Sequence, residues 1–140
     1  MSSPAFAFLD ASALIYLVEA GEPFAARVRR ELGALLESAP STAVALSRLT
    51  WLECRIRPLR EGDTQVLAAF DAFFARPDIV WVELDAQVVE LATAIRALAR
   101  LKTPDALQAA CCLQLGPAHH FVTGDAAFRK VKGLNVRLLK

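Results

Sequence analysis

Three aspartates in the sequence stand where a strand ends or a helix begins. Asp10 directly follows a short apolar run, and Asp125 comes two residues after another. Asp105 falls in the first turn of a helix that Thr103-Pro104 is suited to open. Functional groups gather beyond the carboxyl ends of parallel strands. We therefore expect the three carboxylates to share one edge of the molecule.

Glu53 is a fourth acid, and it lies inside an expected helix over residues 47–57. Leu49, Leu52 and Ile56 mark the expected apolar face of that helix. At 100° per residue, Glu53 is about 40° from Leu49, so its side chain should point toward the protein. A lone buried charge is costly and requires a cation or a proton.

Carboxylates gathered in one place repel one another and raise each other's pKa. A small, hard divalent cation such as Mg²⁺ or Mn²⁺ relieves this repulsion, because it prefers carboxylate oxygens and water as ligands. Such an ion activates water and neutralises charge on a phosphate. The hypothesis is therefore metal-dependent phosphodiester hydrolysis, with Asp10, Glu53, Asp105 and Asp125 as metal ligands and catalytic residues.

Each acid also has a purely structural explanation. Asp10 and Asp125 suit helix N-caps, Asp105 suits a first helical turn, and Glu53 suits a half-exposed helix face. For any single acid we favour the structural explanation. Taken for all four together it is weaker, because it leaves Glu53 without a partner.

The cysteine pattern argues against disulfides and zinc. Cys54, Cys111 and Cys112 are odd in number, with one adjacent pair, which suits a reducing compartment. His119 and His120 follow the pair without the C-x-x-C or H-x-x-x-H spacing of zinc sites. We expect buried thiols instead.

The surrounding pattern predicts one domain over residues 1–140 in which strands alternate with helices. This alternation favours a three-layer α/β/α fold around a parallel sheet of about five strands. The expected strands are 5–9, 42–46, 79–84, 121–123 and 136–139. The expected helices are 12–20, 23–38, 47–57, 63–75, a long helix after an Asp85 N-cap up to Leu101, and one after a Thr103 N-cap.

Composition bears on partners and location. Hydrophobic residues make up 55% of the 140 residues, which exceeds the need of a small monomer and predicts a partner surface, as in a dimer. The opening MSSPAFAFLD lacks a basic segment, and Gly116-Pro117 interrupts the uncharged run 106–124. We expect neither a signal peptide nor a membrane span, and a cytoplasmic location.

A nucleic-acid substrate would need cations for its backbone. The net charge is only +1, so no global basic field is present. The candidates near the acids in sequence are Arg55, Lys102, Arg129 and Lys130; Arg27, Arg30, Arg96 and Arg100 are alternatives, and each of these residues could equally belong to a solvated face. The aromatic candidates for stacking on nucleic-acid bases are Tyr16, Trp51 and Trp81.

Four segments give the chain a family resemblance: FLDASALIYLVE at 8–19, LTWLECRI at 49–56, KTPDALQAACCL at 102–113 and FVTGDAAF at 121–128. In these segments the sequence resembles the PIN-domain family, and within it the VapC-type toxins of toxin–antitoxin pairs. The four pieces run nearly end to end in the family's order.

The resemblance implies the same three-layer fold and a Mg²⁺- or Mn²⁺-dependent endoribonuclease. It also implies a homodimer that a small antitoxin neutralises. Asp10, Glu53, Asp105 and Asp125 match the family's acidic positions. Ser12 matches a small hydroxyl that follows the first acid, and Thr123 matches the threonine before the last acid, where it would orient a carboxylate or water. Many relatives carry a further acid where this chain has Ala127, so a second metal position would be weaker.

Two alternatives stay open at this point. A haloacid-dehalogenase-like phosphohydrolase also begins with an aspartate after its first strand, but it needs D-x-D, and Ser12 stands at the second position. A non-catalytic PIN scaffold that binds RNA or protein would have no reason to keep all four acids.

Overall fold

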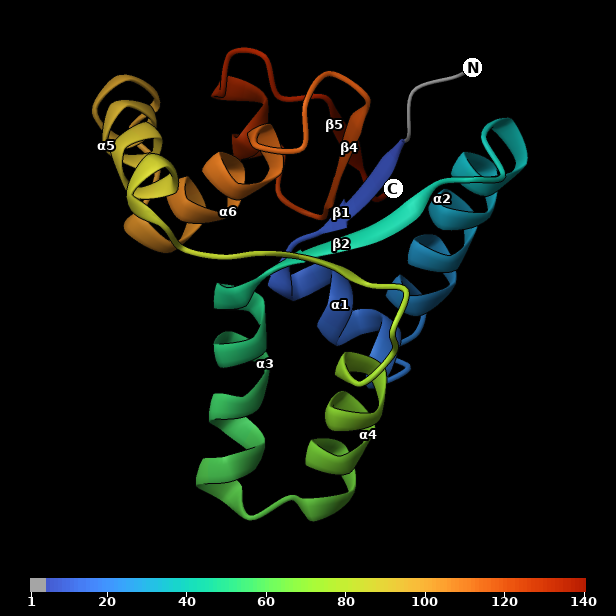
Figure 1. Ribbon diagram of the computed structural model, residues 1–140. Coiled ribbons are helices and arrows are strands. Elements are labelled where there is room, and N and C mark those ends of the chain that lie inside the picture. Colours follow the sequence, from blue (N-terminus) through green and yellow to red (C-terminus); the bar gives the residue numbers. More distant parts are fainter. Residues whose placement is uncertain (1–4) are drawn as a thin grey trace.

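The computed structural model of the protein describes residues 5–140, so the first residues of the opening stretch lie outside it. Figure 1 shows its elements. In chain order they are β1 (Phe6–Leu9), α1 (Ala11–Val18), α2 (Phe24–Ser38), β2 (Ala43–Ser47), α3 (Arg48–Glu61), α4 (Thr64–Phe74), β3 (Val80–Val82), α5 (Ala86–Ala99), α6 (Thr103–Leu113), β4 (His119–Thr123), the 3₁₀ helix η1 (Ala126–Lys130) and β5 (Val136–Leu138).

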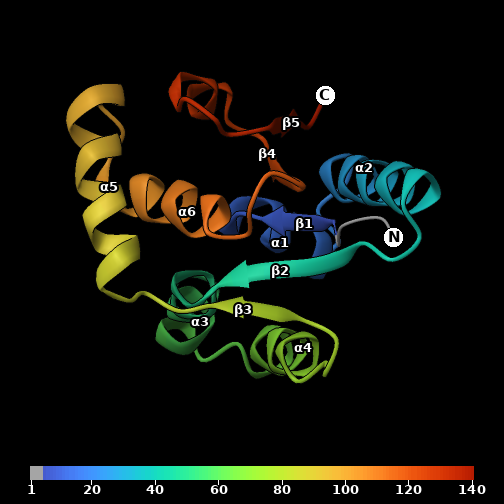
Figure 2. The same cartoon turned by 45° about the horizontal axis from the view of Figure 1, so that its top comes forward.

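The five strands form one parallel sheet in the order β3-β2-β1-β4-β5 (Figure 2). The strand β1 is central, and Phe8 pairs with Ala45 on one side and Phe121 on the other. Because all strands run the same way, the residues that follow them meet at one edge. Asp10, which follows β1, and Asp125, which follows β4, lie at this edge, as predicted.

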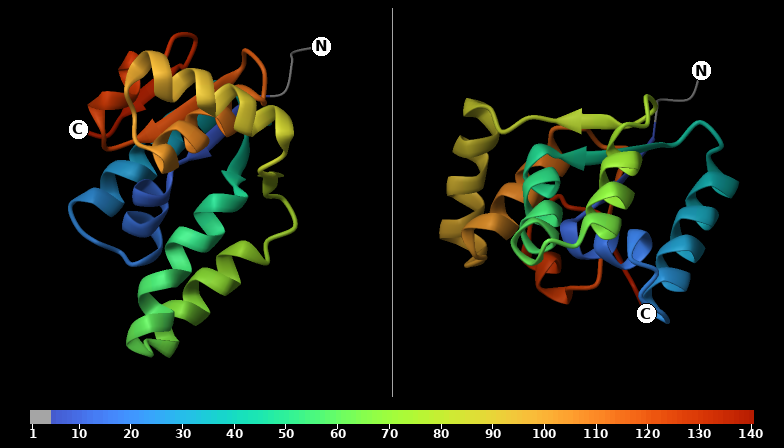
Figure 3. Two further views of the ribbon diagram at one scale, coloured as in Figure 1. Left: turned by 90° about the vertical axis from the view of Figure 1, so that its left-hand side faces the viewer. Right: turned by 90° about the horizontal axis from the view of Figure 1, so that it is seen from below.

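Helices cover both faces of the sheet, which confirms the three-layer prediction. Alternate residues of a strand point to opposite faces. Phe8 and Phe121 accordingly belong to the core under α5, α6 and η1, whereas Leu9 and Val122 belong to the core under α1 to α4. The left view of Figure 3 shows α5 and α6 in front of the strands, as the layer on one face of the sheet.

The helices α3 and α4 lie side by side and project away from the sheet (Figures 1 and 3). The buried residues of α3 are Thr50, Cys54 and Pro58, while Leu52 and Ile56 are 49% and 47% exposed. The predicted apolar face of this helix was therefore wrong. The helix packs against α1, α4 and α6 as well as β2, so the sheet alone does not set the direction of its inner face.

The prediction for α5 was closer. Asp85 is its N-cap and accepts a hydrogen bond from the Val88 N–H at 2.9 Å. Val88, Ala92 and Ile95 form its buried face, whereas Leu98 is 87% exposed. The following cap was misplaced by one residue, because Lys102 takes the N-cap of α6 and Thr103 is its first residue.

Two further expectations concern thiols and membranes. The three cysteines are buried and free. Within residues 5–140, no helix combines the length and apolar character that crossing a bilayer requires.

Candidate active site

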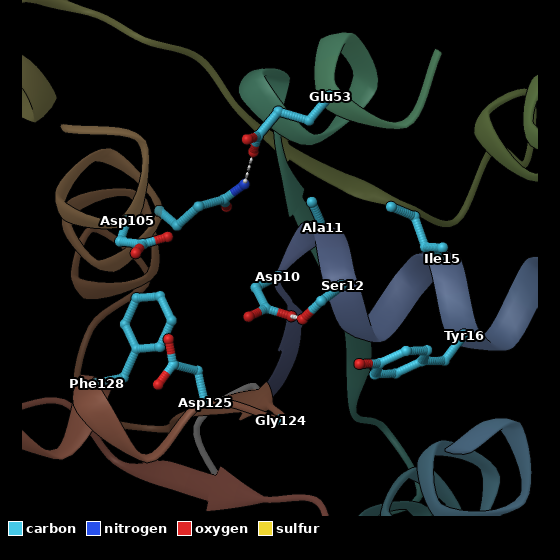
Figure 4. A pocket seen from close by; sticks show the side chains of 11 residues that line it. Asp10, Ala11, Ser12, Ile15, Tyr16, Glu53, Asp105, Gly124, Asp125 and Phe128 are labelled. Atoms are coloured by element: carbon cyan, nitrogen blue, oxygen red, sulfur yellow. Dashed lines mark hydrogen bonds between the residues drawn. The ribbon is translucent and has the colours of Figure 1, made fainter. Parts of the chain in front are cut away.

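All four predicted acids line one cavity of about 500 Å³ at the carboxyl edge of the sheet. Figure 4 shows the carboxylates of Asp10, Asp105 and Asp125 facing a common space, with Glu53 above them on α3. The remaining lining residues are Ala11, Ser12, Ile15, Tyr16, Gln108, Gly124 and Phe128. The acids come from four separate parts of the chain, and the fold brings them together.

Asp10 is buried, and both oxygens of its carboxylate accept hydrogen bonds. One oxygen, Oδ1, accepts hydrogen bonds from the Ala13 N–H at 2.9 Å and the Ser12 hydroxyl at 3.0 Å. The other, Oδ2, accepts one from the Thr123 hydroxyl at 2.6 Å. Asp10 is thus the N-cap of α1 and also a wall of the cavity, so the structural and functional explanations of this residue are compatible.

Thr123 joins Asp10 to the last acid. Its hydroxyl donates to Asp10 and accepts a hydrogen bond from the Asp125 N–H at 3.0 Å. Asp125 in turn caps η1 by accepting from the Ala127 N–H at 2.9 Å. The single hydroxyl therefore links the two acids that follow β1 and β4.

Glu53 is hydrogen-bonded to a residue that was not predicted to belong to the site. Its Oε1 accepts a hydrogen bond from the Gln108 amide at 3.1 Å. Gln108 is 2% exposed and lies one helical turn after Asp105 on α6. The only signal in the sequence was a polar residue within the small, apolar run of that helix.

Burial and mutual repulsion set the electrostatics of the cavity. Burial raises the pKa of Asp10, of Glu53 and of Asp105 above the ordinary values. The charge of Asp105 raises the pKa of Asp10 and Glu53 further, and that of Asp125 raises the pKa of Asp105. The four carboxylates therefore sense one another, which is the condition that a cation would relieve.

The arrangement suits a hydrated ion better than a fully enclosed one. Among residues 5–140, no three His, Cys, Asp or Glu side chains lie close enough together to hold an ion directly. Mg²⁺ dehydrates reluctantly and is usually bound through one or two carboxylates with several waters. A cavity of this size with carboxylates on several walls fits that mode of binding.

The four predicted RNA contacts lie outside the lining of the cavity. The Arg55 side chain is paired with Asp71 at 3.1 Å and lies 4.4 Å from the centre of the Trp51 ring. Lys102 is near enough to lower the pKa of Asp105, against the effect of burial. Arg129 and Lys130 are exposed on η1.

Fold and site together define an α/β domain with an acidic cavity where its parallel strands end. The family model for the PIN domain matches residues 7–134 of the chain. The chain therefore belongs to the PIN domain family, as its sequence had indicated.

Solved structures with the same fold include three toxin–antitoxin assemblies. VapBC2 of Rickettsia felis, bound to a promoter DNA fragment, matches with a TM-score of 0.76 at 14% identity, covering 96% of this chain and 99% of that one. A Klebsiella pneumoniae toxin–antitoxin complex matches with a TM-score of 0.68 at 21% identity, covering 96% and 98%. DNA-bound VapBC of Salmonella typhimurium matches with a TM-score of 0.68 at 20% identity, covering 97% of this chain and 99% of that one. Comparison with curated proteins gave no match.

Proposed function

We propose that the protein is a Mg²⁺- or Mn²⁺-dependent endoribonuclease, the VapC-type toxin of a toxin–antitoxin pair. The observation that carries this proposal is the meeting of Asp10, Glu53, Asp105 and Asp125 around one cavity. When bound there, a divalent ion would supply an activated water and neutralise charge on the phosphate.

The residues of this chain then have distinct tasks. Asp10, Asp105 and Asp125 would hold the ion, partly through its bound waters, with Glu53 as a further ligand directly or through water. Ser12 and Thr123 would orient the Asp10 carboxylate, because both hydroxyls donate to it. No histidine is required, and neither His119 nor His120 lines the cavity.

The substrate would lie across the open side of the cavity. Tyr16 forms part of the wall and stacks on Phe24, with ring centres 4.7 Å apart. Proteins commonly bind unpaired RNA by stacking its bases on aromatic rings. Lys102, Arg129, Lys130 and Arg55 remain the proposed phosphate contacts, although the ion pair of Arg55 with Asp71 would have to open.

The partners follow from the same proposal. A small antitoxin would neutralise the enzyme, since the structural relatives named above are complexes of this kind. A homodimer would cover apolar residues that the single chain leaves exposed, such as Leu98. We also propose a cytoplasmic location, which suits the free, buried cysteines.

The decisive experiment compares RNA cleavage by wild type, Asp10→Asn and Asp63→Asn with Mg²⁺, with Mn²⁺ and with a chelator. Asp63 is a matched control, because it caps α4 by accepting from the Val66 N–H at 3.1 Å and lies outside the cavity. We expect Asp10→Asn to lower the cleavage rate by at least about 100-fold, roughly 3 kcal/mol of transition-state stabilisation. Asp63→Asn should retain the rate.

Two outcomes would contradict the proposal. Equal cleavage by Asp10→Asn and wild type would remove the acids from the mechanism. Failure of the wild type to bind Mn²⁺ in calorimetry would favour the non-catalytic scaffold. Membership of the PIN family already argues against the phosphohydrolase alternative, for which hydrolysis of a small phosphoester without RNA cleavage would be the sign.

A further inference from the structure

A buried amide connects α6 to α3 beside the acids. The Gln108 side chain lines the same cavity as Glu53 and is 2% exposed. Its partners lie 55 to 61 residues away in the chain. Glutamine is seldom this buried unless its hydrogen bonds are satisfied, so its partners explain its presence.

Every polar hydrogen of the Gln108 amide has a partner. Nε2 donates to the Thr50 hydroxyl at 2.8 Å and to Glu53 Oε1 at 3.1 Å. Oε1 accepts from the Ser47 hydroxyl at 2.9 Å. The amide has two donors and one carbonyl oxygen, and all three groups are bonded.

Glu53 determines which way the amide points, and the Ser47 hydroxyl is suited to that direction. The Ser47 hydroxyl oxygen accepts the Thr50 N–H at 3.2 Å as the N-cap of α3, which leaves its hydrogen to donate to Gln108. A rotated amide would present its carbonyl oxygen to the Glu53 carboxylate, and two acceptors would face each other. The amide therefore presents its NH2 group to Glu53, and Ser47 at the end of β2 holds its carbonyl oxygen.

We propose that Gln108 is a positioning residue that holds the Glu53 carboxylate toward the cavity by a neutral hydrogen bond, while Ser47 holds the carbonyl end of the amide. The proposal rests on the metal-dependent function above. Glu53 Oε2 has no hydrogen bond with any residue from 5 to 140, so it is available to an ion or its water. A lysine or arginine in place of Gln108 would bring a positive charge that competes with the ion.

The test is a double-mutant cycle on Mn²⁺ affinity, measured by calorimetry on the full chain. Gln108→Met keeps an unbranched side chain but removes the donors. We expect it to raise the Mn²⁺ dissociation constant about tenfold or more, the usual effect of losing a residue that orients a ligand. In a Glu53→Gln background, the same substitution should change the dissociation constant less than about twofold, because its target is gone.

Thr50→Val is the matched control. It removes another Gln108 partner from the same network while leaving the bonds to Ser47 and Glu53 in place. We expect it to lower the melting temperature without moving the Mn²⁺ dissociation constant more than about twofold. Should Gln108→Met fail to fold, Gln108→Leu removes the same donors with another apolar side chain, and the same weakening is expected there and not in Thr50→Val.

The outcomes separate this inference from the proposed function. Wild type that binds no Mn²⁺ would overturn both. Wild type that binds Mn²⁺, together with a Gln108→Met effect that is absent or equally large in the Glu53→Gln background, would overturn the positioning role alone. In that case Gln108 would only pack α6 against α3.

Discussion

The Asp10 carboxylate accepts hydrogen bonds from three donors and is buried beside other acids. The donors favour its charged form, but burial outweighs them, and the net effect is a raised pKa. In the metal-free protein the folded state therefore binds the Asp10 proton more tightly than the unfolded state does. The ionised carboxylate destabilises the fold near neutral pH, and protonation removes this penalty as the pH falls through the raised pKa.

This balance predicts that Asp10→Asn stabilises the metal-free protein at neutral pH. The advantage should shrink as the pH falls through the raised pKa of Asp10 toward the ordinary value of 3.8, below which both states are protonated. Chemical unfolding of both proteins in chelator, across a series of pH values, measures it. Because the comparison is a difference, acids outside the cavity cancel, while release of Glu53 from the Asp10 charge, which raises the pKa of Glu53 beyond the effect of burial, adds to the same trend.

Added metal should reverse the order of stability at neutral pH. At a Mn²⁺ concentration of about 100 times the dissociation constant, wild type gains about 2.7 kcal/mol, while Asp10→Asn gains less. If Asp10→Asn were more stable than wild type in chelator by the same amount at every pH, burial of the ionised Asp10 carboxylate would not be the cause.

At the scale of the element, α1 brings several cavity residues to one face. Ser12, Ile15 and Tyr16 are three and four residues apart and all line the cavity. The stacked ring of Tyr16 is the proposed contact for an RNA base.

Tyr16→Leu should therefore weaken binding of a short unstructured oligoribonucleotide by about 5-fold to 100-fold, the usual range for one stacked base. Fluorescence anisotropy in Ca²⁺, which slows cleavage, measures this binding. Mn²⁺ affinity should not change, since the ring offers no ligand, and Tyr16→Phe should bind RNA like wild type. Equal affinity in Tyr16→Leu would place the substrate elsewhere.

The helices and strands also show how much of the fold could be predicted from the sequence. The order and type of the strands and long helices were predictable, because the hydrophobic period and the caps, such as Asp85, are local signals. The buried face of α3 was not, since α1, α4 and α6, and not the sheet alone, decide which side is covered. Glu53 was expected to point inward, and it does, although Leu52 and Ile56 do not.

The candidate site divides in the same way. Asp10 and Asp125 could be placed because one topological rule locates residues that follow parallel strands. Gln108 could not, because its partners Ser47 and Glu53 are brought to it only by the packing of α6 against α3. Contacts between residues so far apart in the chain produce no periodic pattern from which they could be predicted.

At the scale of the whole molecule, α5 carries apolar surface that the chain itself leaves uncovered. One apolar cavity, of about 510 Å³, lies between α5 and α6 and includes Val89, which is 50% exposed. A second, of about 230 Å³, includes Leu98 beside Leu113. Exposed apolar surface of this kind marks contact with another protein, and we expect that contact to be the second copy in the proposed homodimer.

Leu98→Glu should therefore weaken the dimer. A charge at the centre of an apolar contact should raise the dimer dissociation constant by at least about tenfold, or 1.4 kcal/mol. Sedimentation of wild type, Leu98→Glu and Leu36→Glu over a range of concentrations measures this. Leu36 is a matched control, because it is 46% exposed on α2, outside both cavities. If Leu36→Glu dissociated the dimer and Leu98→Glu did not, the contact would lie on the face of α2, and α5 would be left for the antitoxin.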